Sequence, residues 1–218
     1  MWYAEHHGSI AQIDFPPAVV IAHVASATQA VRVGFGGGLA VNHSPLSLAE
    51  QFGALASFHP GRIDLGVGRG PGTFDPVAAR ALRRGEDPAT DEEYQDDVAS
   101  ILQYVADRPE IPEPWLLASS PAGATLAARL GLPLAFAYHI RPEGIAEALR
   151  RYRDIFQPSR WCDAPHVMLS VQTICADTEA AAAVLARHIE VHRPPWSPKG
   201  RISLCWTCAP RLRTCSRP

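Results

Sequence analysis

Short apolar segments alternate with helix-forming segments along most of this 218-residue chain. We expect strands at 2–5, 30–33, 62–67, 115–118, 134–138 and 167–176, and helices at 18–28, 46–58, 90–105, 125–130, 142–156 and 179–189. Such alternation predicts parallel strands that are joined by helical crossovers, and therefore an α/β fold. An open doubly wound sheet and a (β/α)8 barrel both fit, but six strands are too few to close the barrel.

The composition is that of a globular protein with no strong surface charge. Apolar residues make up 47% and charged residues 19% of the chain, and 20 Lys and Arg against 22 Asp and Glu leave a net charge of −2. No apolar run reaches the ~18 residues that span a bilayer. The N-terminus lacks the basic and apolar regions of a secretory signal. We therefore expect a cytoplasmic protein without a nucleic-acid or membrane partner.

The cysteines and histidines do not predict a metal site. Five cysteines are scattered, and their odd number does not suggest a disulfide framework. Cys205 and Cys208 form a lone CxxC pair without a second pair of ligands. The histidines show no HxH or HExxH spacing. We predict no bound metal.

The last part of the chain differs in character from the rest. Arg, Pro, Cys and Trp dominate residues 192–218, without an apolar period of either kind. We predict a domain at 1–191 and a non-homologous or disordered tail at 192–218. Translation past a frameshift, an artificial end and a flexible extension would each explain such a tail.

The segment His59–Gly72 joins a helix stop, a strand and a glycine-rich turn. Pro60 and Gly61 end the preceding helix, and Arg69 follows the strand between two glycines. Its guanidinium is a planar fork of donors that suits a phosphate, and glycines allow a ligand close to the backbone. The alternative is an exposed arginine that pairs with a carboxylate.

A second anion site is predicted where the strand at 115–118 meets its helix. Ser119 and Ser120 supply two hydroxyls at the helix N-terminus, where free N–H groups attract negative charge. Plain N-capping explains Ser120, but it does not explain the small residues that follow, up to Gly123. Because Arg69 comes from a neighbouring strand end, we expect both segments to share one phosphate.

A histidine and a run of glycines complete the candidate residues. His6 and His7 are adjacent, so on a strand only one of them faces a pocket. Such a histidine can serve as a general base near neutral pH, although a hydrogen-bonded structural histidine is the alternative. Gly34 and Gly36–Gly38 indicate unusual backbone dihedrals or close contact with a ligand.

These motifs together resemble those of the bacterial luciferase-like flavin monooxygenases. The matching segments are Ala4–His7, Arg32–Gly38, Asn42–Pro45 with Ala49–Gln51, His59–Gly72, and Ser119–Pro121 through Gly131–Pro133. Their order and spacing, rather than any one glycine pattern, carry the resemblance. It covers Trp2 to about Ile189.

The resemblance implies a (β/α)8 barrel that holds reduced FMN at the carboxyl ends of its strands and uses O2 on a small organic substrate. A separate flavin reductase would supply the reduced FMN, and a homodimer is an open expectation. F420 is the less favoured cofactor. By resemblance, the phosphate is held by Arg69, Gly70, Pro71, Ser119, Ser120 and Gly123, a non-proline cis peptide beneath the flavin lies at Gly36 and Gly37, and His6 assists the flavin chemistry.

The chain departs from this family pattern at both ends. Met1 falls inside the second strand, and the segment after Val191 stands where the eighth strand is expected. We therefore expect an incomplete barrel with about six of eight strands. A truncated, catalytically inactive fragment is the alternative function, and a barrel that uses F420 or another phosphorylated ligand is the third.

Overall fold

A six-stranded parallel sheet forms the centre of the computed structural model, which describes residues 1–8, 16–70, 72–84, 87–191 and 202–205. Its strands, in spatial order, are β1 (Trp2–Tyr3), β2 (Val33–Leu39), β3 (Ile63–Gly68), β4 (Glu113–Ala118), β5 (Leu134–Phe136) and β6 (Val167–Leu169). Spatial order equals chain order, which is the topology of a (β/α)8 barrel and not of a doubly wound sheet. The predicted incomplete barrel is thus confirmed for the described residues.

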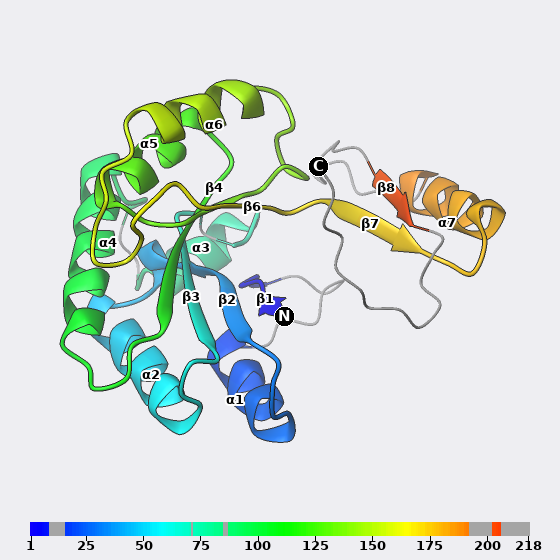
Figure 1. Cartoon of the computed structure of the whole chain (residues 1–218). Coiled ribbons are helices and arrows are strands. Elements are labelled where there is room, and N and C mark those ends of the chain that lie inside the picture. Colours follow the sequence, from blue (N-terminus) through cyan, green and yellow to red (C-terminus); the bar gives the residue numbers. More distant parts are fainter. Residues whose placement is uncertain (9–15, 71, 85–86, 192–201, 206–218) are drawn as a thin grey trace.

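The helices of the described residues are α1 (Pro17–Ala27), α2 (Pro45–Phe58), α3 (Pro76–Leu82), α4 (Asp91–Ala106), α5 (Pro121–Leu130), α6 (Ile145–Asp154) and α7 (Glu179–Val191), with a 3-10 turn, η1, at Ala40–Asn42. Of these, α1, α2, α4, α5 and α6 cover the outer side of this sheet (Figure 1). A continuous apolar core lies between the strands and α1, α2, α4, α5 and α6. Phe35 of β2, for example, stacks on Phe52 of α2 with ring centroids 5.3 Å apart. No helix in the described part of the chain is long and apolar enough to cross a membrane.

The inner side of the sheet is lined by glycine where the Trp2 indole lies. A Cβ on Gly34 would stand 2.6 Å from Trp2 Nε1, and one on Gly36 would stand 2.8 Å from Trp2 Cε3. Both distances are shorter than non-bonded atoms can approach, so these positions admit only glycine while the indole stays in place. The glycine run of β2 therefore makes room for a side chain of β1.

Three elements differ from the predicted ones. The strand expected at 30–33 begins at Val33 and runs to Leu39, so the glycines lie within it. The long apolar strand expected at 167–176 is two strands, β6 and β7 (Gln172–Cys175), which belong to different sheets. The segment 73–89, where we expected neither helix nor strand, contains α3, which has no buried residue and hence no apolar face that the sequence would show.

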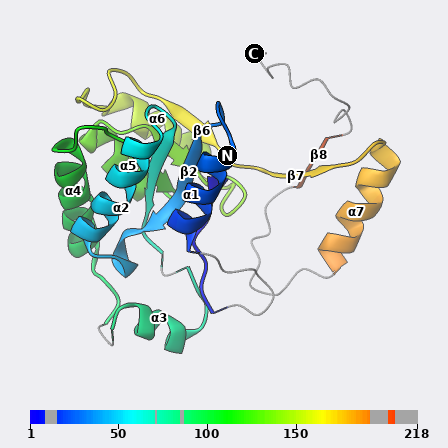
Figure 2. The same ribbon diagram turned by 90° about the horizontal axis from the view of Figure 1, so that it is seen from below.

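A small second sheet lies apart from the barrel strands. β7 pairs in parallel with β8 (Ile202–Cys205), and α7 lies beside them (Figure 2). β8 falls within the predicted tail at 192–218, whose other residues lie outside the described ones. The domain boundary at 191 stays a prediction.

Thr90 and Glu93 have the spacing of a capping box, and the box is formed at the start of α4. Glu93 N–H donates to Thr90 Oγ1 over 3.1 Å, and Thr90 N–H donates to Glu93 Oε2 over 2.7 Å. We expect Thr90→Ala to lower the free energy of unfolding by about 1 kcal/mol, measured by urea denaturation. Ser44→Ala is the control, because Ser44 stands at the N-cap of α2 but makes no side-chain cap bond there. Equal losses in both variants would contradict the assignment.

Candidate functional site

The two predicted anion-binding segments lie at the same edge of the sheet. β3 and β4 are parallel neighbours, and Val67 of β3 pairs with Leu116 of β4. Continuing this register by two residues sets Arg69 level with Ala118, directly before Ser119. The structure therefore brings Arg69 and Ser119 to adjacent strand ends, as the sequence predicted.

Arg69 is held at the surface by α4. Its guanidinium pairs with Asp91, and Nη2 donates to the Ala89 carbonyl oxygen over 3.2 Å. The side chain is 51% exposed, so solvent and ligands can reach the guanidinium. This is the carboxylate pairing that the sequence left as the alternative, and phosphate binding stays a prediction. Gly70 is open, since a Cβ there would meet nothing closer than 3.9 Å, and Pro71 lies outside the described residues.

Ser120 caps α5, whereas no described residue bonds the Ser119 hydroxyl. Ser120 Oγ accepts the Gly123 N–H over 3.4 Å, a long bond that matches plain N-capping. A Cβ on Gly123 would stand 2.6 Å from the Ala118 Cβ. The glycine thus allows α5 to pack against its own strand, and this packing explains the small residue without a ligand. The roles of Ser119, Ser120 and Gly123 beside a phosphate stay predictions.

The peptide bond between Gly36 and Gly37 is cis, as the resemblance implies. It lies in β2 beside a break in register with β3, where Gly36 pairs with Gly66 but Gly38 pairs with Val67. A Cβ on Gly37 would stand 2.8 Å from Leu117 Cδ2 on β4. The position beneath a flavin ring stays a prediction.

A buried carboxylate, which the sequence did not single out, organises the carboxyl ends of β1 and β2. Glu5 is 3% exposed. Five contacts reach its two oxygens: His7 Nε2 at 2.7 Å, His43 Nε2 at 2.9 and 3.0 Å, Leu39 N at 2.9 Å and Asn42 Nδ2 at 3.2 Å. His6, the predicted base, is exposed and lies outside this cluster. We call Glu5, His7 and His43 the Glu5 cluster.

The partners of Glu5 decide its charge. Burial is the largest single influence and would raise the pKa of Glu5, but the hydrogen bonds from His43, the Leu39 N–H and His7 and the electrostatic attraction of His43 together hold the pKa below its usual value. Glu5 is therefore a carboxylate at neutral pH. The spacing of Glu5 and His7, two apart on an extended chain, was the one sequence signal for their contact. His43, the residue after η1, reaches Glu5 only through the tertiary fold, which the sequence does not show.

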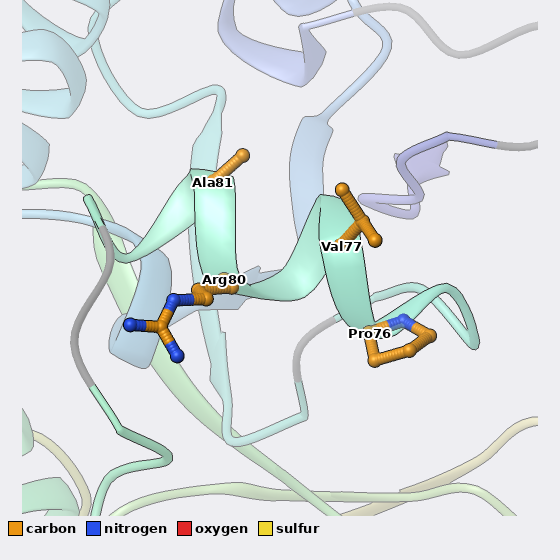
Figure 3. Close-up of a pocket in the computed structure, with 4 residues that line it drawn as sticks. All are labelled: Pro76, Val77, Arg80 and Ala81. Carbon is orange, nitrogen blue, oxygen red and sulfur yellow. The ribbon is translucent and has the colours of Figure 1, made fainter.

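A cavity of about 490 Å³ lies beside α3 (Figure 3). Pro76, Val77, Arg80 and Ala81 line it, all of them exposed residues of one short helix. None of them lies at a strand end, where barrels keep their chemistry. We assign the candidate site to the strand ends and not to this cavity.

Comparison with known proteins agrees with this geometry. The family model described as "Luciferase-like monooxygenase" matches residues 1–204. The chain belongs to the luciferase-like monooxygenase family. It is 46% identical over 197 residues to the uncharacterized protein YvbT of Bacillus subtilis, and 40% identical over 196 residues to a luciferase-like monooxygenase of Escherichia coli. These alignments cover 85% and 84% of the chain.

A solved structure that is similar in sequence shares this fold. The crystal structure of apo-MsnO8 superposes with a TM-score of 0.80 at 39% identity, covering 88% of this chain and 61% of MsnO8. The chain spans 58% of the length of YvbT and of the Escherichia coli relative. Membership in the luciferase-like family is thus shown over most of the chain, and the activity of the longer relatives is carried to it only as a proposal.

Proposed function

We propose that the ends of β3 and β4 bind the phosphate of FMN and that the chain is the oxygenating part of a flavin-dependent monooxygenase. The observation that carries this proposal is the placement of Arg69 and Ser119 at adjacent parallel strand ends, with Ser119 directly before Ser120, the N-cap residue of α5. Guanidinium, hydroxyl and free helical N–H groups are the donors that phosphates meet in proteins.

The residues present fit such a ligand in charge and in space. Arg69 is half exposed and Gly70 leaves its surroundings open, so a phosphate can approach without moving the backbone. Arg69 already pairs with Asp91, which a phosphate would have to replace or share. An exposed pair of this kind contributes only about 0–1 kcal/mol, so this competition does not prevent binding.

Bound reduced FMN would supply the electrons for the reaction. The balance is substrate + O2 + FMNH2 → oxygenated substrate + FMN + H2O, in which two protons reach the oxygen atom that leaves as water. The chain's own residues would anchor the phosphate at Arg69 and Ser119 and present proton-carrying side chains near the ends of β1 and β2. His6 and the Glu5 cluster are the groups there that can carry a proton.

One named relative supports a separate component that supplies reduced flavin, whereas the choice of FMN over F420 rests on the family resemblance alone. One relative, 24% identical over 212 residues, is the oxygenase component of a flavin-dependent trigonelline monooxygenase. Such a name implies another component that delivers reduced flavin. Solved structures with FMN and with an F420 adduct share the fold at 20% and 15% identity, so the fold alone does not choose the cofactor.

Titration with FMN and riboflavin, followed by flavin fluorescence, tests the phosphate site. We expect Arg69→Ala to raise the dissociation constant for FMN at least tenfold and to leave that for phosphate-free riboflavin within about twofold. The control is Asp91→Asn, which removes the partner but keeps the guanidinium, and should change FMN affinity by less than about fivefold.

Two outcomes would reject the proposal. An equal loss for FMN and riboflavin in Arg69→Ala would remove Arg69 from the phosphate site. If the unmodified chain binds no FMN at ~1 mM, the binding free energy is weaker than about −4 kcal/mol, and this chain is not a flavin enzyme. If F420 binds more tightly than FMN in the same titration, F420 is the cofactor in place of FMN, and the proposed phosphate site is unchanged.

A further inference from the structure

The hydrogen bonds of the Glu5 cluster fix which nitrogen of each imidazole carries a proton. An ionised carboxylate only accepts hydrogen bonds, so a ring nitrogen that contacts it must donate. His7 and His43 both meet Glu5 through Nε2, at 2.7 Å and 2.9 Å from Oε1. Both rings therefore carry hydrogen on Nε2, and Nδ1 is the basic nitrogen of each.

The cluster is buried at the carboxylate and open at the imidazoles. The Glu5 side chain is 1% exposed, whereas those of His7 and His43 are 28% and 29% exposed. No described residue bonds Nδ1 of either ring. A purely structural tie needs no such opening, because a buried carboxylate is satisfied as well by buried donors. Two basic nitrogens at the carboxyl edge of the sheet thus have no hydrogen-bond partner among the described residues, and each can take a proton.

The cluster is joined to the candidate site through the backbone. The N–H of Leu39 donates to Glu5 Oε2. Leu39 is also the last residue of β2, the strand that contains the cis peptide. His7 N–H donates over 2.9 Å to the carbonyl oxygen of Gly72, in the loop that carries Arg69. Gly72 has a φ of +69°, and a Cβ there would stand 2.8 Å from the Glu5 carbonyl oxygen. The rings are therefore fixed relative to the ends of β1, β2 and β3.

The other charged groups of the described residues leave the cluster isolated. Among the described residues, ion pairs join Glu5 only to His7 and His43, and Arg32, Asp64 and Glu113 form their own group at the amino ends of the strands. No set of three or more side chains among the described residues is arranged to hold a metal ion. The hydrogen-bonded arrangement, and not metal ligation, is what the geometry supports.

We propose that Glu5 is a positioning residue that holds His7 and His43 as a pair of proton carriers, each with Nδ1 turned away from the carboxylate. This inference rests on the proposed function, because the protons would go to the oxygen atom that leaves as water. One ring takes a proton from solvent on Nδ1 and becomes an imidazolium beside Glu5. It then returns to the neutral form as this proton passes to the oxygen atom that leaves as water. No electron moves in this step and no bond other than N–H and O–H changes.

The positioning is tested without any flavin, by imidazole ¹⁵N spectra of the histidine-labelled chain. In the unmodified chain we expect two exchange-protected Nε2–H signals, from His7 and His43. In Glu5→Gln the amide offers one oxygen and one NH2 group, so at least one of these signals should vanish or its ring should change tautomer. His139, whose Nδ1 lies 2.9 Å from Ser170 Oγ, is the control in the same spectrum and should not change.

Single histidine variants keep the test valid if Glu5→Gln does not fold. In His7→Gln the His43 Nε2–H signal should persist, and in His43→Gln the His7 signal should persist. Two unchanged, protected signals in folded Glu5→Gln would overturn the positioning role, and so would the loss of the remaining signal in either folded histidine variant.

Turnover with saturating reduced FMN tests the proton transfer itself. We expect His7→Gln and His43→Gln to lower kcat about 100-fold and to leave the dissociation constant for FMN within threefold, since proton carriers typically contribute 10²–10⁴-fold. An unchanged kcat would overturn the proposed proton transfer, and so would a lower kcat that is accompanied by an equal loss of FMN affinity. If the unmodified chain binds no FMN, the proposed function fails while the ¹⁵N spectra still decide the positioning.

Discussion

We expect Gly66→Ala to lower the free energy of unfolding by more than about 3 kcal/mol, a large part of the roughly 5–15 kcal/mol that stabilises a typical native protein. Gly66 lies in the middle of β3, and a Cβ there would stand 2.2 Å from the Phe35 carbonyl oxygen on β2. That atom is backbone, so relief requires moving β2 away from β3. The methyl group would also stand 2.6 Å from Leu117 Cδ1, and this side chain could turn aside.

Gly70→Ala is the matched control for this substitution. Gly70 follows the same strand, has no positive φ, and would place its Cβ no closer than 3.9 Å to another atom. We expect a change within about 0.5 kcal/mol, or a small gain from a less flexible unfolded chain. Urea denaturation of both variants measures the difference. A Gly66→Ala variant as stable as Gly70→Ala would show that β2 and β3 are not packed as described.

The features that were predictable from sequence are local or periodic. Alternation of apolar and helical segments needs only neighbouring residues, and it predicted the parallel sheet. The capping box at Thr90 is a four-residue pattern, and it is formed. Arg69 and Ser119 follow strands that are consecutive in the sheet, so parallel topology alone brings their ends to one edge.

The features that were missed depend on contacts between distant segments. The second histidine of the Glu5 cluster comes from 38 residues along the chain, and no spacing rule links them. The apolar run at 167–176 was read as one strand, because periodicity does not show that Leu169 ends one sheet and Gln172 begins another. The need for glycine at 66 is set by a carbonyl oxygen of another strand.

We expect Arg32→Ala to lower the free energy of unfolding by about 3 kcal/mol, because it leaves a buried carboxylate without its cation. Asp64 is 5% exposed at the amino end of β3. It accepts the Trp2 Nε1–H over 2.8 Å and the Arg32 Nε–H over 3.1 Å, and pairs with a second nitrogen of Arg32. Burial would lower the pKa of Arg32, but Asp64 and Glu113 outweigh it and raise the pKa, so the cation is present at any ordinary pH.

Two further variants separate lost charge from lost packing. Glu113 also pairs with Arg32 but its side chain is 45% exposed, so Glu113→Gln should cost less than about 1 kcal/mol. Asp64→Asn in the Arg32→Ala background removes the uncompensated charge and can keep the bond from Trp2 through its amide oxygen. The double variant should therefore be more stable than Arg32→Ala alone, by about 1 kcal/mol or more in urea denaturation. If it is less stable, the loss in Arg32→Ala comes from packing of the arginine side chain, and the Arg32–Asp64 pair is not what joins the amino ends of β2 and β3.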